Sequence, residues 1–136
     1  MSAERKEALD RIRALAEACA EAALEKKATD VLLLDVRVLT SLADWFVIAS
    51  GRSDTQVRAI AEAVETAGRT RGRRPLWVEG LSHGQWVLLD YGDIVVHVFF
   101  GPVREFYDLE RLWSKAPRVE MAEPKASDGS VQEAAR

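Results

Sequence analysis

The pentapeptide Gly80-Leu81-Ser82-His83-Gly84 matches the G-x-S-x-G pattern that presents the serine nucleophile of many hydrolases. Asp90 or Asp93, and then His97, follow it in the chain order that these enzymes use. The pattern requires a strand before the serine, a helix after it and a large sheet. Here a hairpin strand follows, and 136 residues are few for that fold. We therefore interpret Ser82 as part of a glycine-flanked turn and keep a Ser82-based hydrolase as the alternative.

Metal and phosphate sites have weaker support. His83 and His97 lie on different expected elements, and the single cysteine, Cys19, offers no metal-binding pair. Gly51-Arg52-Ser53 precedes an expected helix, but it lacks the further glycines and the lysine of a phosphate-binding P-loop. We favour a plain strand-to-helix turn there, and we expect no cofactor and no metal.

Four arginines gather between Arg69 and Arg74. Cations at this point complement the dipole of a helix that ends here, which is worth ~0.3–1 kcal/mol. A local contact with RNA phosphates is the alternative. The net charge of −3 excludes a bulk attraction to nucleic acid or to an anionic membrane.

Length and composition favour one domain. A chain of 136 residues with 48% hydrophobic residues fits a single folded unit, which we expect over residues 1–116. Residues 117–136 are polar and without period, so we expect a disordered tail. No apolar run approaches the roughly 20 residues of a membrane span, and the N-terminal segment does not resemble a signal peptide. A cytoplasmic protein without a membrane partner is the simplest expectation.

Apolar periodicity predicts alternating helices and strands. Ser53 followed by Gln56 is a capping box that opens the second helix, and Gly72 is suited to end it. We expect Asp108 to mark a kink in the last helix and to cap its final turn. The expected helices span residues 4–26, 53–72 and 101–113, and the expected strands span 31–39, 44–50, 76–78, 86–91 and 94–100. This order implies a mixed sheet flanked by helices.

The segment from Trp86 to Trp113 is typical of a β-hairpin followed by an aromatic-rich helix. Glycine at Gly92 accepts the positive φ that a two-residue type II′ turn needs at its first central position. Pairing Tyr91 with Ile94 then sets the register. One face is wholly apolar and must be core: Val87, Leu89, Val96, Val98 and Phe100. The other face carries Trp86, Leu88, Asp90, Val95, His97 and Phe99, and either another element or a partner must cover its large apolar side chains.

Four segments, in this order, resemble the ribosomal silencing factor family, also called the Iojap-like proteins. They are TSLADWFVIASGRSDTQVRAIAEAV, VEG, WVLLDYGDIVVHVFF and REFYDLERLW. The resemblance implies an α/β fold: a single-domain, five-stranded mixed sheet flanked by helices, similar in topology to nucleotidyltransferases. It implies no catalysis, because the family lacks that fold's pair of metal-binding carboxylates. The sequence agrees, since Gly51-Arg52-Ser53 is followed by a single Asp54 and no D-x-D.

The resemblance also implies a function. Family members bind the large ribosomal subunit through the protein called L-fourteen, on the face that meets the small subunit. The bound factor blocks subunit joining and lowers translation when nutrients are scarce. The family motifs and the mixed hairpin face together predict a partner-binding set: Trp86, Leu88, Asp90, Gly92, Asp93, His97, Phe99, Arg104, Tyr107 and Glu110.

Two alternatives to this regulator remain open from the residues. One is a small enzyme, either nucleotidyltransferase-like or based on Ser82. The other is an RNA-binding protein that uses Arg69 to Arg74, which in the ribosomal setting would add a minor rRNA contact. The regulator itself is a candidate homodimer when free, because an exposed apolar face without its partner is a candidate surface for self-association.

Overall fold

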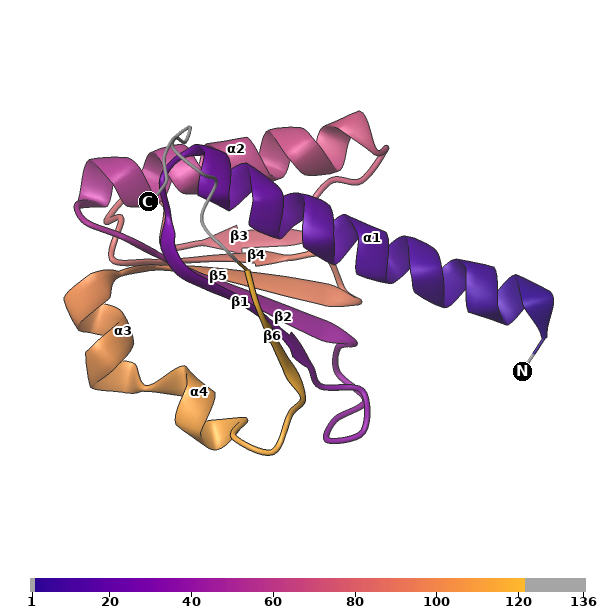
Figure 1. Ribbon diagram of the computed structural model, residues 1–136. Coiled ribbons are helices and arrows are strands. Elements are labelled where there is room, and N and C mark those ends of the chain that lie inside the picture. The colour runs from indigo at the N-terminus through magenta and orange to yellow at the C-terminus, as the bar shows by residue number, and fades with distance from the viewer. Residues whose placement is uncertain (1, 122–136) are drawn as a thin grey trace, which may run out of the picture.

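The computed structural model describes residues 2–121 and folds them into four helices and six strands (Figure 1). The helices are α1 (Ala3–Glu25), α2 (Asp54–Thr70), α3 (Gly101–Tyr107) and α4 (Leu109–Leu112). The strands are β1 (Thr29–Asp35), β2 (Trp45–Gly51), β3 (Trp77–Glu79), β4 (Trp86–Asp90), β5 (Ile94–Phe100) and β6 (Arg118–Glu120). Helices α1 and α2 cover one face of the sheet, the upper face, and α3 and α4 lie against the opposite, lower face (Figure 1).

The strands form one mixed sheet in the order β3-β4-β5-β2-β1-β6. Strands β2 and β5 are parallel, and the other neighbouring pairs are antiparallel. The α/β class is as predicted, but the sheet has six strands rather than five. The additional strand comes from Arg118–Glu120, inside the segment that we expected to be disordered, and it pairs with Leu32–Leu34 at the edge of β1. The rest of that predicted tail, residues 122–136, lies outside the described residues.

The hairpin has the predicted register. Trp86–Asp90 pairs antiparallel with Val95–Phe99, and the Tyr91 amide donates to the Ile94 carbonyl at 2.8 Å. Gly92 has φ +90°, the positive value that the turn requires. The predicted core face therefore packs beneath α1 and α2, and the mixed face points to the lower layer.

The first strand is shorter than predicted. It ends at Asp35, whereas its apolar pattern predicted a strand to Leu39. The Asp35 carboxylate accepts hydrogen bonds from the backbone amide of Arg37 at 3.2 Å and from its guanidinium at 2.9 and 2.6 Å. This local pairing turns the chain away from the sheet, because it competes with the backbone hydrogen bonds that would extend β1.

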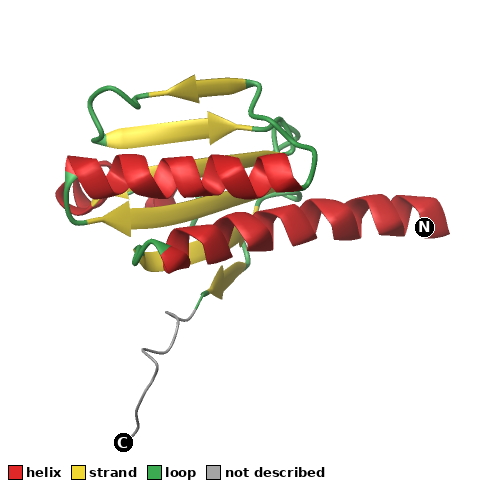
Figure 2. Ribbon diagram, turned by 90° about the horizontal axis from the view of Figure 1, so that it is seen from above, coloured by secondary structure: helices red, strands yellow, loops and turns green. Residues whose placement is uncertain are grey.

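The upper layer consists of two helices that lie side by side across the sheet (Figure 2). The C-terminal half of α1 packs on the sheet through buried residues such as Leu15 and Cys19, and its N-terminal half extends beyond the sheet edge (Figures 1 and 2). None of the helices in residues 2–121 is long and apolar enough to cross a membrane.

The lower layer is divided at Asp108, as predicted. Asp108 adopts a left-handed conformation with φ +49°, which ends α3 and begins α4. Its side chain makes no capping hydrogen bond, contrary to expectation; its carbonyl instead accepts from the Arg111 amide at 3.0 Å. The kink turns α4 back so that Leu109 and Trp113 pack against the lower face.

Candidate interaction surface on the lower face

The residues that suggested a hydrolase do not assemble. Ser82 and His83 are exposed in the loop between β3 and β4, with Ser82 Oγ 3.3 Å from His83 Nδ1. His97 is buried on the lower face, and Asp93 accepts two hydrogen bonds from Arg73, at 2.7 and 3.3 Å. Strand β4, rather than a helix, follows the serine, so the geometry differs from that of a nucleophile elbow.

The Gly51-Arg52-Ser53 turn is bonded to its own helix. The Arg52 amide donates to Gln56 Oε1 at 2.6 Å, and the Ser53 hydroxyl accepts from the Gln56 amide at 3.0 Å. These bonds confirm the predicted cap of α2 and use the groups that would have held a phosphate. Within residues 2–121, no group of three or more His, Cys, Asp or Glu side chains is arranged to hold a metal ion.

Trp86 lies at the centre of an aromatic cluster on the lower face. Its ring centroid lies 4.7 Å from that of Phe99 and 5.0 Å from that of Tyr107, and its Nε1 donates to His97 Nδ1 at 3.1 Å. Phe99 is fully buried, Trp86 is half-buried and Tyr107 is 54% exposed. The cluster therefore connects the interior of the lower layer with its surface.

Burial governs the protonation of His97. Because Nδ1 accepts the Trp86 indole hydrogen, the proton of the neutral ring resides on Nε2, which is buried and has no hydrogen-bond partner within residues 2–121. Burial lowers the pKa of His97 from 6.5 to about 4. Protonation at Nδ1 would turn this atom into a donor, and the hydrogen bond from the Trp86 indole would be lost. His97 is therefore a neutral structural group at neutral pH.

The free energy of unfolding is expected to decrease as the pH falls from 6.5 to about 4, because only the unfolded chain binds a proton at His97 in this range. Stability thus rises with pH across the window, by up to ~3 kcal/mol in total. His97→Gln keeps an acceptor for the Trp86 indole but cannot titrate, so its urea-unfolding free energy should change less over the same range. Equal slopes for the two proteins would contradict this role of His97.

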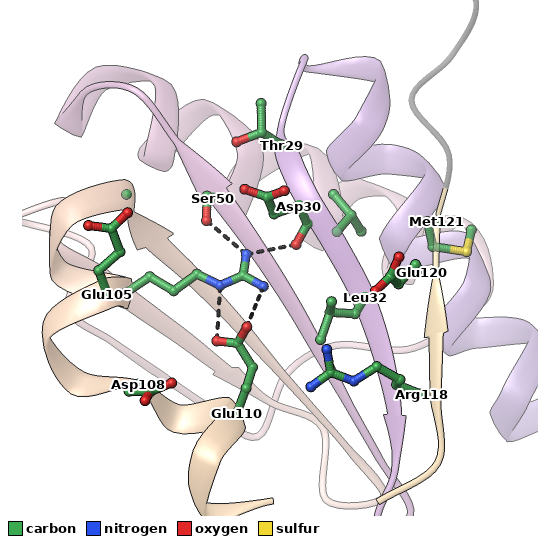
Figure 3. A pocket seen from close by; sticks show the side chains of 13 residues that line it. Thr29, Asp30, Leu32, Ser50, Glu105, Asp108, Glu110, Arg118, Glu120 and Met121 are labelled. Atoms are coloured by element: carbon green, nitrogen blue, oxygen red, sulfur yellow. Dashed lines mark hydrogen bonds and ion pairs between the residues drawn. The ribbon is translucent and has the colours of Figure 1, made fainter. Parts of the chain in front are cut away.

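Arg104 fastens the lower helices to the sheet. The residue is 7% exposed, and its Nη1 donates to the Asp30 carbonyl at 2.7 Å and to Ser50 Oγ at 2.8 Å. Its Nε and Nη2 each donate to the Glu110 carboxylate, both at 3.1 Å. Figure 3 shows these partners converging from β1, β2 and α4. The arginine therefore bridges the kink at Asp108 and anchors both sides of it.

A β-bulge in β1 directs a carbonyl toward this arginine. The pairing of β1 with β2 shifts by one residue between Thr29 and Leu32, and Asp30 has φ +50°. The surrounding cleft has a volume of about 520 Å³ and is lined by charges of both signs, among them Glu105 and Arg118 (Figure 3). Because Arg104 already makes four hydrogen bonds, we interpret the cleft as an anchoring site rather than a ligand site.

The two carboxylates of the hairpin turn are bonded within the chain. Asp90 Oδ1 accepts from the Gly92 amide at 2.7 Å, which stabilises the turn. Arg73, in the arginine cluster, donates to Asp93 at 2.7 Å and to the Tyr91 carbonyl at 3.0 Å. The turn is thereby tied to the loop that follows α2.

Exposed aromatic side chains border the buried cluster. Trp77 is 60% exposed, and its pairing with Asp90 puts it on the lower face, the face that also carries half-buried Leu88. On α3, Phe106 is 81% exposed, and it lines a groove of about 490 Å³ together with Trp86 and Tyr107. We call the surface formed by Trp77, Trp86, Leu88, Phe106 and Tyr107 the aromatic surface.

The predicted partner-binding residues divide by burial. His97, Phe99 and Arg104 are 5%, 0% and 7% exposed, and this burial favours a structural role for these three over direct contact with a partner. Tyr107 is exposed, and six further members are partly exposed: Trp86, Leu88, Asp90, Gly92, Asp93 and Glu110. Trp77 and Phe106 were not in the predicted set, but both are exposed. Trp77 could not be assigned to a face from the sequence, because the orientation of a strand as short as β3 depends on its pairing with β4.

The chain is similar to known proteins over most of its length. The family model described as ribosomal silencing factor during starvation matches residues 9–136. The chain is 41% identical over 97 residues to the ribosomal silencing factor RsfS of Bacillus subtilis (strain 168), covering 71% of this chain and 82% of that protein. It is 35% identical over 102 residues to the chloroplastic protein Iojap of Zea mays, covering 75% of this chain and 44% of that protein.

A crystal structure supports the same relationship. The structure of a Chromobacterium violaceum protein superposes with a TM-score of 0.74 at 39% sequence identity, over 76% of this chain and 86% of that one. The match of the family model and the identity to curated relatives agree with the motifs along residues 29–114. The chain therefore belongs to the ribosomal silencing factor family, RsfS and Iojap-like proteins, whose members regulate translation and are not enzymes.

Proposed function

We propose that this chain binds the large ribosomal subunit through protein L-fourteen, on the face that meets the small subunit, and thereby prevents the subunits from joining. Translation would then fall when nutrients are limiting, in the cytoplasm and without any reaction catalysed by the chain. We assign the contact with protein L-fourteen to the aromatic surface. The observation that carries the proposal is the exposure of Trp77, Phe106 and Tyr107 beside a buried aromatic cluster, in a member of this family.

The chemistry of the aromatic surface favours a protein partner. Tryptophan and tyrosine supply most of the binding energy at many interfaces because they bury a large area with few rotatable bonds. Trp86 packs against both Phe99 and Tyr107, and this contact restricts the motion of Tyr107, which lowers the entropy lost on binding. Glu79 and Asp90 carry negative charge at the margin, which complements a basic ribosomal protein.

A second copy of the chain is the competing occupant of the aromatic surface. A symmetric dimer would bury the same side chains in the free protein and would have to dissociate before the ribosome could bind. Dimerisation would therefore weaken the observed affinity for the large subunit as the protein concentration rises.

The test is sedimentation of the purified protein with isolated large subunits, followed by addition of small subunits. We expect the protein to co-sediment with the large subunit and the yield of joined particles to fall as its concentration rises. Addition of the protein to small subunits alone serves as the control and should give no co-sedimentation. Absence of association with large subunits at near-physiological salt would refute the proposal.

A further inference from the structure

A basic groove separates the overhanging part of α1 from the loop that follows α2. Its volume is about 400 Å³, and its floor is apolar, with Ala8, Ile12 and Leu15 from α1. Arg11 lines one wall, and Arg71 and Arg73 line the other. The groove lies in the upper layer, where the N-terminal half of α1 projects past the sheet (Figures 1 and 2).

The arginines around the groove differ in how they are paired. Arg73 is held by Asp93 at 2.7 Å, so its charge is largely neutralised within the chain. Arg11 and Arg71 are exposed, and neither forms an ion pair within residues 2–121. These two guanidinium groups are therefore available to an external anion.

The helix dipole does not account for this arrangement. Dipole stabilisation falls off within the last turn of a helix, and Arg69 is the basic residue in the last turn of α2. The dipole of α2 can stabilise Arg69 and the C-cap residue Arg71, but Arg11 lies in the N-terminal half of α1, where a helix dipole does not favour a cation. Arginines from two separate elements thus line one groove without a shared structural partner.

We propose that this groove binds the phosphate backbone of RNA through Arg11 and Arg71, the two arginines of its lining that form no ion pair within residues 2–121. Guanidinium groups bind phosphate with paired hydrogen bonds, and an apolar floor accommodates sugars or bases between the charged walls. Arg71 caps the C-terminus of α2, and a short loop leads from it to β3, which carries Trp77 of the aromatic surface. The inference rests on the proposed function in one respect: the RNA would be the rRNA that adjoins the ribosomal protein contacted by the aromatic surface.

The test compares two double variants with the same change in charge. Arg11→Glu/Arg71→Glu reverses the charge of the two unpaired arginines that line the groove. Arg52→Glu/Arg111→Glu reverses the charge of two exposed arginines elsewhere that form no ion pair within the described residues. Binding is measured over a series of salt concentrations, with a labelled RNA hairpin, with isolated large subunits and with isolated protein L-fourteen. We expect the groove variant to bind the hairpin and the large subunit at least ~10-fold more weakly, with a salt slope reduced by about 2, and the control variant to bind as the unaltered protein does.

Three other outcomes would overturn the RNA assignment, and a fourth would overturn only the proposed function. Unchanged affinity of the groove variant for both the hairpin and the large subunit would show that the groove binds neither. Equal weakening by both double variants would indicate a general charge effect. Weaker binding to isolated protein L-fourteen, with hairpin binding unchanged, would identify an acidic protein segment as the occupant. If the unaltered protein fails to bind large subunits but binds the hairpin through the groove, the proposed function fails and the groove stands.

Discussion

Replacement of Arg104 by alanine is expected to lower the free energy of unfolding by about 3–5 kcal/mol. The substitution removes four hydrogen bonds and leaves the Glu110 carboxylate and the Asp30 carbonyl without their donor. Because Arg104 is 7% exposed, these bonds are shielded from water in the folded chain, and water that enters the enlarged cleft compensates for their loss only in part. Urea denaturation followed by circular dichroism measures the change.

Arg118→Ala is the matched control for this experiment. Arg118 lines the same cleft but is exposed, so its loss should change the free energy of unfolding by no more than about 0.5 kcal/mol. Glu110→Gln retains an acceptor for Arg104 and should fall between the two. A cost for Arg104→Ala as small as that for Arg118→Ala would disprove the anchoring role.

The variant Trp77→Ala is expected to bind the large ribosomal subunit at least ~30-fold more weakly, a loss of about 2 kcal/mol. Trp77 is 60% exposed in the free protein, so its truncation should leave the fold nearly unchanged. Trp86→Ala is a less clean test, because that side chain also packs on Phe99 and bonds to His97. Titration of the labelled protein with large subunits gives the affinity.

Leu76→Ala provides the comparison for Trp77→Ala. Leu76 is 76% exposed and immediately precedes Trp77, but alternation along the strand directs it away from the lower face. Its truncation should not change the affinity by more than twofold. Equal weakening by both substitutions would mean that β3 acts as a whole, and unchanged binding by Trp77→Ala would move the contact away from the aromatic surface.

Sequence patterns predicted the hairpin well because its signals are local. Gly92 supplies the positive φ of the turn, and pairing of Tyr91 with Ile94 then sorts every following residue onto one face or the other. The cap of α2 is equally local, since Ser53 and Gln56 lie within one turn. In these segments, the interactions that fix the structure lie within a few residues of one another.

Features that depend on distant partners were not predictable in the same way. The polar β6 has no pattern of its own, and it is a strand because the edge of β1 is available to it. The burial of Phe99 and His97 depends on α3 and α4, which fold back through the Asp108 kink and the Arg104 anchor. The exposure of Trp77 likewise follows from the register of β3 against β4. The sequence therefore predicted the two faces of the hairpin, but which side chains on them are exposed depends on the packing of the other elements.

The late position of the lower layer in the chain affects folding during synthesis. Leu32, Leu34 and Ile48 are made early, yet the residues that cover them include Val103, Leu109, Trp113 and Ala116. The edge of β1 stays unpaired until β6 has emerged from the ribosome. A nascent chain that stalls before residue 100 would thus present an apolar sheet face and an open strand edge, the two features that most favour aggregation. The central strands are therefore covered and paired only after the segment from Gly101 to Glu120 has been translated.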